Sequence, residues 1–187
     1  KILQGKQTQK VLAFYKPVGV TCTERDPHAE KKIMDMIRYP ERLTYAGRLD
    51  KDSEGLILLT NDGDLINAMM RGANRHEKEY IVKTDREITP DFLEKMAKGI
   101  YLKDLDITTR ECEIEQIGKF TFRIVLTQGV NRQIRRMCEA CGYRVKALKR
   151  IRIMNILLGD LKPGKWREIT GEELEQLQRD TGMLNRN

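Results

Sequence analysis

The chain has 187 residues, which is enough for one domain or two small lobes with a proper hydrophobic core. It contains 35 lysines and arginines against 28 aspartates and glutamates, a net charge of +7 that favours polyanionic partners. The four cysteines are scattered, and there is no signal peptide and no apolar run of 18 residues, which argues against a disulfide scaffold and a membrane-spanning protein. We therefore expect a cytoplasmic protein that does not bind membranes.

The N-terminal third predicts two strands and two helices. Residues 1–9 are polar and predict a linker, and 11–17 (VLAFYKP) predicts the first strand of a domain that spans 10–187. A helix is expected over 30–38, ended by Pro40. The apolar run 56–60 predicts a buried strand, followed by a turn at 61–63 and a helix with Asp64 as N-cap and Gly72 as its end.

The middle of the chain predicts a helix between strands. Residues 79–83 favour a strand, and Thr89-Pro90 with Gly99 are typical start and stop signals of a helix. The segments 107–115 and 119–127 predict a hairpin whose second arm places Phe120, Phe122, Ile124 and Leu126 on one side.

The segment 131–142 predicts an amphipathic helix. Its apolar stripe has helical spacing and consists of Ile134, Met137, Cys138 and Cys141. At about 100° per residue, Arg132 and Arg136 fall opposite this stripe, where they can meet phosphates, while Arg135 falls at its edge and can face a cleft beside the core.

The C-terminal part predicts two strands, around 150–157 and 166–169, and a last helix from Thr170 with Glu173 completing a capping box. Strands and helices are mixed without strict alternation, which favours an α+β fold with a largely antiparallel sheet. Residues 131–152 carry eight positive residues against one glutamate, so we expect a phosphate-binding face there.

The sequence contains few of the residues that zinc sites, histidine-based catalysis and nucleotide-binding sites require. Cys138 and Cys141 form a single C-x-x-C pair on an apolar helix face, which favours buried thiols over a zinc site. His28 and His76 are the only histidines, and the glycine-rich signatures of nucleotide sites are missing. We expect no metal and no cofactor.

Three acids precede the apolar run 56–59: Asp50, Asp52 and Glu54. A calcium loop is disfavoured because its glycine and distal glutamate are misplaced. The acids could instead cap a turn and pair with Arg48 and Lys51. Against that, a carboxylate in a basic protein would repel RNA unless a pocket held it for a task, and the residues alone leave both readings open.

Four motifs resemble the pseudouridine synthases, specifically the family that modifies small- and large-subunit ribosomal RNA. They are FYKPVGVTCT (14–23), YAGRLDKDSEGLILLTNDG (45–63), HEKEYIV (76–82) and LTQGVNRQIRRMCEACGYRVKALKRIRIMNI (126–156). Their details are most similar to the F group of large-subunit synthases, associated with 23S rRNA and, in at least one member, with a tyrosine tRNA anticodon. Members usually begin with an S4-type RNA-binding domain, so the resemblance makes 1–9 the remnant of a linker from it.

The resemblance implies the pseudouridine synthase fold, a mixed, mostly antiparallel sheet that spans two lobes with the catalytic cleft across its middle. It also implies isomerisation of uridine in RNA by base flipping. Asp50 matches the catalytic aspartate, and Tyr80 matches the aromatic residue that stacks on the flipped uracil. Arg135 matches the basic residue that pairs with the aspartate, and the helix geometry agrees independently.

The same resemblance extends to the RNA contacts. Arg48 would take the place of the flipped base in the RNA stack, and Leu126 would line the uracil slot. The remaining expected RNA contacts, mostly to phosphates, are Lys16, Asn131, Arg132, Arg136, Lys149 and Arg150. The expected enzyme is a monomer that binds RNA and no nucleotide cofactor. The alternatives are a non-catalytic RNA-binding module and a synthase for 16S rRNA.

Overall fold

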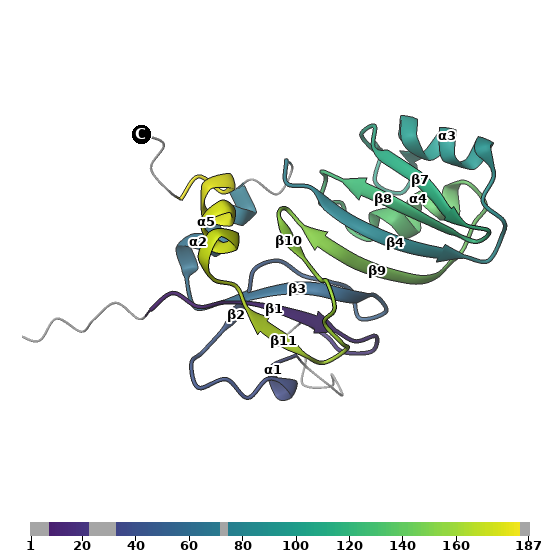
Figure 1. The fold of residues 1–187 in the computed structure, drawn as a ribbon. Coiled ribbons are helices and arrows are strands. Elements are labelled where there is room, and N and C mark those ends of the chain that lie inside the picture. Colours follow the sequence, from purple (N-terminus) through teal and green to yellow (C-terminus); the bar gives the residue numbers. More distant parts are fainter. Residues whose placement is uncertain (1–7, 23–32, 72–74, 184–187) are drawn as a thin grey trace, which may run out of the picture.

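A nine-stranded sheet organises the molecule. The computed structural model describes residues 8–22, 33–71 and 75–183, and Figure 1 shows how the elements are arranged. The strands follow the order β11-β1-β3-β9-β4-β8-β7, with β2 paired to β3 and β10 paired to β9. Every pairing in this sheet is antiparallel except that of β3 with β9. The predicted α+β fold with a mixed, mostly antiparallel sheet is confirmed.

The strands of the main sheet are β1 Val11–Lys16, β2 Thr44–Tyr45, β3 Glu54–Thr60, β4 Lys78–Thr84, β7 Glu113–Gly118, β8 Thr121–Leu126, β9 Val145–Ile153, β10 Ile156–Leu157 and β11 Trp166–Glu168. A separate small ladder joins β5 Tyr101–Leu102 to β6 Ile107–Thr108. The helices are α1 Ile33–Met36, α2 Gly63–Arg71, α3 Pro90–Lys98, α4 Gln133–Ala140 and α5 Gly171–Asp180.

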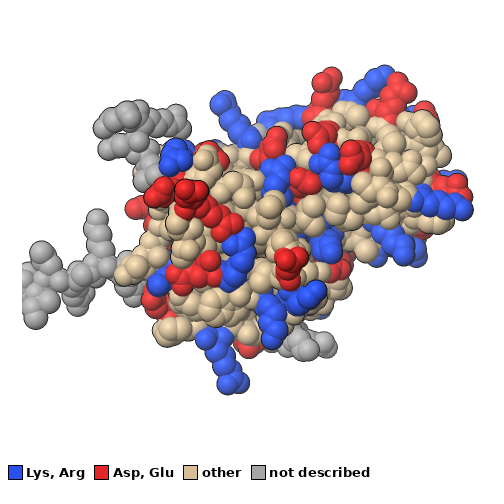
Figure 2. Space-filling view, viewed as in Figure 1, with Lys and Arg blue, Asp and Glu red and all other residues tan. Residues whose placement is uncertain are grey.

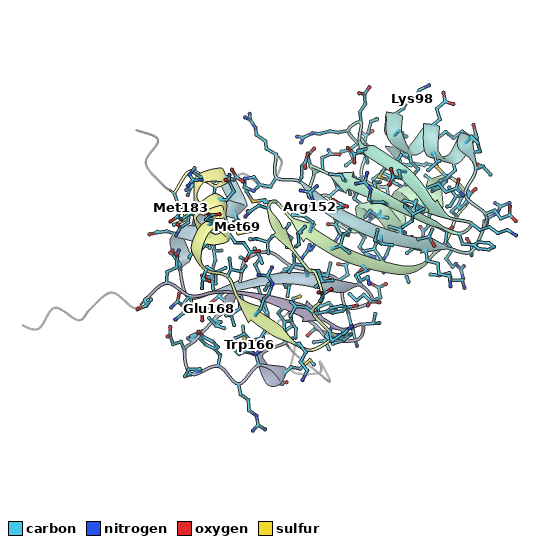
Figure 3. All side chains as sticks on the ribbon, viewed as in Figure 1. Met69, Lys98, Arg152, Trp166, Glu168 and Met183 are labelled. Atoms are coloured by element: carbon cyan, nitrogen blue, oxygen red, sulfur yellow. The ribbon has the colours of Figure 1, made fainter. Side chains whose placement is uncertain are left out.

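The first half of the sheet consists of β11, β1, β3 and β2, and the second half of β9, β10, β4, β8 and β7. In the first half, β1 and β3 are buried on both faces. One face of these strands packs with α2 and α5, where Met69 and Met183 lie close together (Figure 3). The other face packs with α1 through residues such as Phe14 and Ile33. Double-sided burial explains why both strands are continuous apolar runs without alternation.

In the second half, the sheet is covered on one face only. There α3 and α4 pack Phe92 and Met137 against Phe122 and its neighbours. On the opposite face, Arg123 and Arg152 form ion pairs with glutamates of β4, β7 and the residue before β4, so positive and negative side chains interleave (Figure 2). The alternating pattern predicted for 119–127 is therefore confirmed for β8, although Phe120 lies outside the strand and is exposed.

The two halves meet where β3 runs parallel to β9. The register pairs Glu54 with Lys149 and Gly55 with Arg150. Gly55 has φ +113°, and a Cβ atom on it would lie 2.2 Å from the backbone oxygen of Arg150, so only glycine fits. This contact places the loop that precedes β3 against the middle of the sheet.

Several predicted helix ends are wrong. The described part of the helix expected over 30–38 is α1, which ends at Met36, and residues 30–32 lie outside the described residues. The cap of α2 is Asp62 and not Asp64, because its Oδ1 accepts hydrogen bonds from the amides of Asp64 and Leu65. Thr170 stands at the N-cap of α5 without a side-chain cap bond, and Glu173 pairs with Arg167 instead of completing a capping box.

Two strand predictions need correction as well. The segment 107–115 is not one arm of a hairpin, since β6 pairs with β5 and the hairpin arm β7 begins only at Glu113. The strand expected around 150–157 is split by a turn at Met154, whose φ is +54°, into the long β9 and the short β10. By contrast, the Thr89 cap and the Gly99 end of α3 are confirmed. Among the described helices, none is long and apolar enough to span a bilayer.

Candidate active site

A cavity of about 700 Å³ lies between the two halves of the sheet, within the size range of ligand pockets. Its walls come from β2, the loop that precedes β3, α2, β4, the segment after β8, α4 and β9. Most of the predicted site residues line it, and these are Arg48, Asp50, Tyr80, Leu126, Asn131, Arg132, Arg135 and Arg150. Lys16, Arg136 and Lys149 do not.

The loop 48–52 is held through its backbone. Each of its five carbonyl oxygens accepts a hydrogen bond, from Arg150 Nη1, Cys22 Sγ, the Ser53 amide, the Gly19 amide and Arg135 Nη2 in chain order. The donors come from four separate segments of the chain. Because ordering from several sides fixes a loop in one conformation, the side chain of Asp50 leaves this loop in a defined direction.

Asp50 is half-exposed and faces the cavity. Its Oδ2 accepts a hydrogen bond of 3.3 Å from Arg132 Nη1. Its other oxygen, Oδ1, has no hydrogen-bond donor among the residues that the structure describes. One carboxylate oxygen is thus held by a cation and the other is left for a ligand.

Asp52 is the main partner of the nearby arginines. Arg132 donates to both of its oxygens, at 3.1 and 2.8 Å, and Arg135 Nη2 lies 3.5 Å from Oδ1. The hydrogen bond from Arg132 holds the pKa of Asp52 below its usual value, against the opposing effect of partial burial. Asp52 therefore stays ionised and anchors two cations beside Asp50.

Arg135 lies at the edge of the buried face of α4, as predicted, with its side chain 14% exposed. It does not pair with Asp50: its Nη2 donates to the backbone oxygen of Asp52 at 3.0 Å and to Ser53 Oγ at 3.1 Å. Its buried Nε has no acceptor within the part of the chain that the structure describes. The expected direct ion pair is made by Arg132 instead, because the tip of Arg135 reaches past Asp50 to the next turn of the loop.

Arg132 occupies the N-cap of α4 with φ +51°, a left-handed conformation that is unusual for a residue with a side chain. Such backbone conformations persist where the surroundings impose them, and they cluster at functional sites. Arg132 was predicted as a phosphate contact on the outer face of α4. In the structure its guanidinium is turned into the site and engaged by two carboxylates.

Tyr80 and Leu126 form part of the opposite wall. Tyr80 is half-buried on β4, where it pairs with Ile124 of β8 and Arg150 of β9. Leu126 is buried at the end of β8. Arg48 lines the cavity and is exposed.

Asn131 and Arg136 form a separate pair beside the cavity. The Nε of Arg136 donates to the backbone oxygen of Asn131 at 2.9 Å, and its Nη2 donates to Asn131 Oδ1 at 3.2 Å. The carboxylate nearest to Arg136 is Asp104, at 4.0 Å and itself exposed. Arg136 thus keeps most of its positive charge available to a polyanion.

Lys16 is not a phosphate contact in this structure. Its side chain is fully buried, and Nζ donates to the carbonyl oxygens of Pro17, Val20 and Lys51. Burial lowers the pKa of Lys16 to about 8. The residue ties the loop after β1 to the loop that carries Asp50. Arg150 is also buried, at 4% exposed, but it lines the cavity, whereas Lys149 is half-buried outside it.

Cys138 and Cys141 were expected to be buried thiols, and the structure places them differently. Cys138 is fully buried and burial raises the pKa of its thiol to about 12, while Cys141 is half-buried, and both are free thiols. In the described ranges 8–22, 33–71 and 75–183, no group of three or more histidine, cysteine or carboxylate side chains is placed to hold a metal ion.

Some residues at this site were missed by the sequence reasoning. Cys22 and Ser53 hold the Asp50 loop through contacts that no local pattern reveals. Lys78 lines the cavity, and here a signal existed, because it precedes Tyr80 by two positions on one strand and must share its face. The need for glycine at position 55 follows from the close approach of Arg150 on β9, so it could be recognised only once the β3–β9 pairing was known.

Residues 10–140 match the model of a protein family described as RNA pseudouridylate synthase. The chain belongs to that family. The match contains the Asp50 loop, β4 with Tyr80, Leu126 and all of α4, so the arginines that surround the Asp50 loop from α4 lie within the shared region.

Individual relatives agree with this membership. The dual-specificity RNA pseudouridine synthase RluF of Escherichia coli strain K12 is 47% identical over 167 residues, which are 89% of this chain and 57% of that protein. An uncharacterized RNA pseudouridine synthase of Aquifex aeolicus is 36% identical over 172 residues, 90% of this chain and 71% of that protein. The chain thus spans little more than half the length of the first of these relatives.

A solved structure supports the fold assignment. The crystal structure of a pseudouridylate synthase superposes with a TM-score of 0.84 at 29% identity, over 94% of this chain and 76% of that one. A structure of an H/ACA RNP bound to a substrate RNA shares the fold at a TM-score of 0.55 and 19% identity. The two-lobed pseudouridine synthase fold expected from the sequence is confirmed.

Proposed function

We propose that the protein isomerises uridine to pseudouridine in RNA. The observation that carries the proposal is the convergence of Asp50, Tyr80, Leu126 and Arg135 on one cavity in a chain of this family. The four residues come from four different elements and are separated by up to 85 positions in the sequence. A non-catalytic RNA-binding module would have no need of a free carboxylate oxygen inside a basic protein.

The chemistry requires that the C1′–N1 bond of uridine breaks, that the uracil turns, and that C5 bonds to C1′; the proton on C5 is then lost to solvent and N1 gains one, so the product is an isomer. The unengaged Oδ1 of Asp50 is the group placed to act at the sugar, either by attack on C1′ or through a glycal. The reaction rearranges one nucleotide and needs no external electron or group donor. The residues of this cavity therefore have to bind and orient the nucleotide, act at its sugar through Asp50, and move protons.

The base has to leave the RNA stack to reach the cavity. Arg48, exposed at the cavity, fills the space that the base vacates and offsets part of an unstacking energy of a few kcal/mol. Tyr80 stacks on the flipped uracil, and Leu126 forms the apolar wall of its slot.

Large-subunit ribosomal RNA is the proposed substrate. The support is the similarity to the relatives above and to a ribosomal large subunit pseudouridine synthase B of Vibrio cholerae, which is 34% identical over 178 residues. Transcripts of 23S rRNA, 16S rRNA and tyrosine tRNA that contain 5-tritiated uridine distinguish the targets. We expect release from 23S rRNA; release from 16S rRNA alone would contradict the assignment.

The catalytic assignment is tested with Asp50→Asn. We expect tritium release to fall below detection while RNA binding is largely kept, because the amide keeps the shape of the side chain but cannot act as the nucleophile. Asp104→Asn, an exposed carboxylate outside the cavity, is the matched control. Unchanged release from Asp50→Asn would leave the RNA-binding module as the better explanation.

A further inference from the structure

One charged side chain of the cavity has no part in the scheme above. Lys78 lines the cavity at the start of β4, two residues before Tyr80. Side chains two apart on a strand point to the same face, so Lys78 and Tyr80 both face the cavity. The register places Lys78 beside Leu126 on one side and Ile153 on the other.

Lys78 has no hydrogen-bond acceptor and no carboxylate partner among the described residues. Its neighbours in sequence, Glu77 and Glu79, point to the opposite face, where Arg152 contacts them at 3.0 and 2.8 Å. The acids adjacent in the chain are thus already paired, and they lie on the wrong side of the sheet to reach Lys78.

The surroundings of Lys78 are apolar and positive. Ile153 lies beside Lys78 in the register of β4 with β9, and the apolar side chains of Ile66, Met69 and Met70 of α2 line the same cavity. Arg150 also lines the cavity, and among the described residues its guanidinium donates to the backbone oxygens of Leu56 and Arg48 and to no carboxylate. Burial and the positive charge of Arg150 both lower the pKa of Lys78. Both cations line the cavity, and neither has a carboxylate partner among the residues that the structure describes.

Such an arrangement is unfavourable in the free protein. A desolvated cation without a partner loses hydration and gains nothing in return, and a second cation adds repulsion. The arrangement becomes favourable when a ligand supplies negative charge, because charge-assisted hydrogen bonds in a low-dielectric site are strong. The missing partner is therefore expected on the ligand.

We propose that Lys78, together with Arg150, forms an anion subsite in the cavity wall made by β4 and β9 and binds a phosphodiester of the RNA next to the flipped uridine. The proposal rests on the proposed function, since it takes RNA as the ligand. A flipped nucleotide carries its flanking phosphates toward the pocket that receives the base. A lysine ammonium with three donors suits a phosphate as a compact point charge.

The test is Lys78→Met, which keeps a long unbranched side chain and removes the charge. Binding of a 23S rRNA transcript, measured from 50 to 200 mM salt, should weaken about tenfold, and the slope of log K against log salt should fall by about one. The melting temperature of the free protein should rise, because a desolvated cation has been removed. The matched control is Lys83→Met, an exposed lysine of the same strand outside the cavity.

Each outcome decides a separate point. An unchanged salt slope with reduced tritium release would overturn the phosphate subsite and place Lys78 against the uracil instead. An unchanged slope with unchanged release would show that Lys78 has no role in RNA binding. If the unsubstituted chain binds the transcript but releases no tritium, the proposed function fails, while a reduced slope in Lys78→Met would still support an anion subsite.

Discussion

At the scale of single residues, the two aspartates of the loop that precedes β3 have separate tasks. The resemblance to the family predicted Asp50 as a site residue, whereas for Asp52 the sequence offered only a role in a turn. In the structure both carboxylate oxygens of Asp52 accept hydrogen bonds from Arg132, and Arg135 lies near them. Asp50 keeps one oxygen without a donor among the described residues. Side-chain pairing across 80 positions of sequence has no local signal, which explains why this division was missed.

This division predicts the behaviour of Asp52→Asn. Once the charge of Asp52 is lost, Arg132 should turn toward Asp50 and bind Oδ1, the oxygen that the reaction needs. Single-turnover tritium release should therefore slow by about tenfold to a hundredfold. KM should change less, because the RNA-binding surface is kept. Asp52 acts here as a positioning residue.

The conservative variant Asp52→Glu distinguishes positioning from mere folding. It keeps the charge, so it should recover part of the lost rate and restore the bidentate pair with Arg132. The unfolding transition of both variants in urea should stay close to that of the unsubstituted protein, since the pair is about half exposed. A variant Asp52→Asn with full activity would show that Arg132 is held by other means.

At the scale of elements, periodicity predicted most of the core and failed at the ends. The stripe of α4 and the alternation of β8 were recognised because each element packs one face against one core. The cap of α2 was placed two residues late, because Asp62 and Asp64 both stand at the start of the helix and the sequence does not show which of them accepts from the first-turn amides. For α5 the N-cap position of Thr170 was correct, but the capping box was wrong because Glu173 pairs with Arg167. Contacts between elements, such as the β3–β9 pairing, produce no periodic pattern in the sequence and could not be predicted from it.

The β3–β9 contact predicts a strong effect of Gly55→Ala. The added Cβ would overlap the Arg150 backbone oxygen at 2.2 Å, and φ +113° is itself unfavourable for alanine. We expect a loss of about 3 kcal/mol or more in the free energy of unfolding, measured by urea titration. Activity should fall as well, because the displaced Arg150 no longer holds the carbonyl oxygen of Arg48.

A matched glycine serves as the control. Gly63 begins α2 with nothing within 4 Å of an added Cβ, so Gly63→Ala should leave stability unchanged or raise it by a few tenths of a kcal/mol. Equal effects of the two substitutions would show that β3 and β9 can move apart at Gly55 without loss of stability.

At the scale of the whole molecule, net charge alone gave an incomplete picture of the RNA-binding face. The eight cations of 131–152 were expected to form one phosphate-binding surface. The fold distributes them over α4, the residues that flank it, and β9, which carries Arg152 (Figure 3). Arg132 and Arg135 meet Asp52, and Arg152 meets Glu77 and Glu79. Charges that are paired within the protein contribute less to counterion release than a sequence count implies.

Arg136 is a cation of α4 that stays available beside the cavity, held by Asn131 and only 4.0 Å from the exposed Asp104. Arg136→Ala should therefore weaken RNA binding and lower the salt slope by about one, with little change in the rate of tritium release from bound RNA. Lys98→Ala is the control, because Lys98 lies on α3 outside the cavity and pairs with Glu94 (Figure 3). Equal salt slopes for the two variants would remove the outer face of α4 from the path of the RNA and leave the residues of the cavity wall as the phosphate contacts.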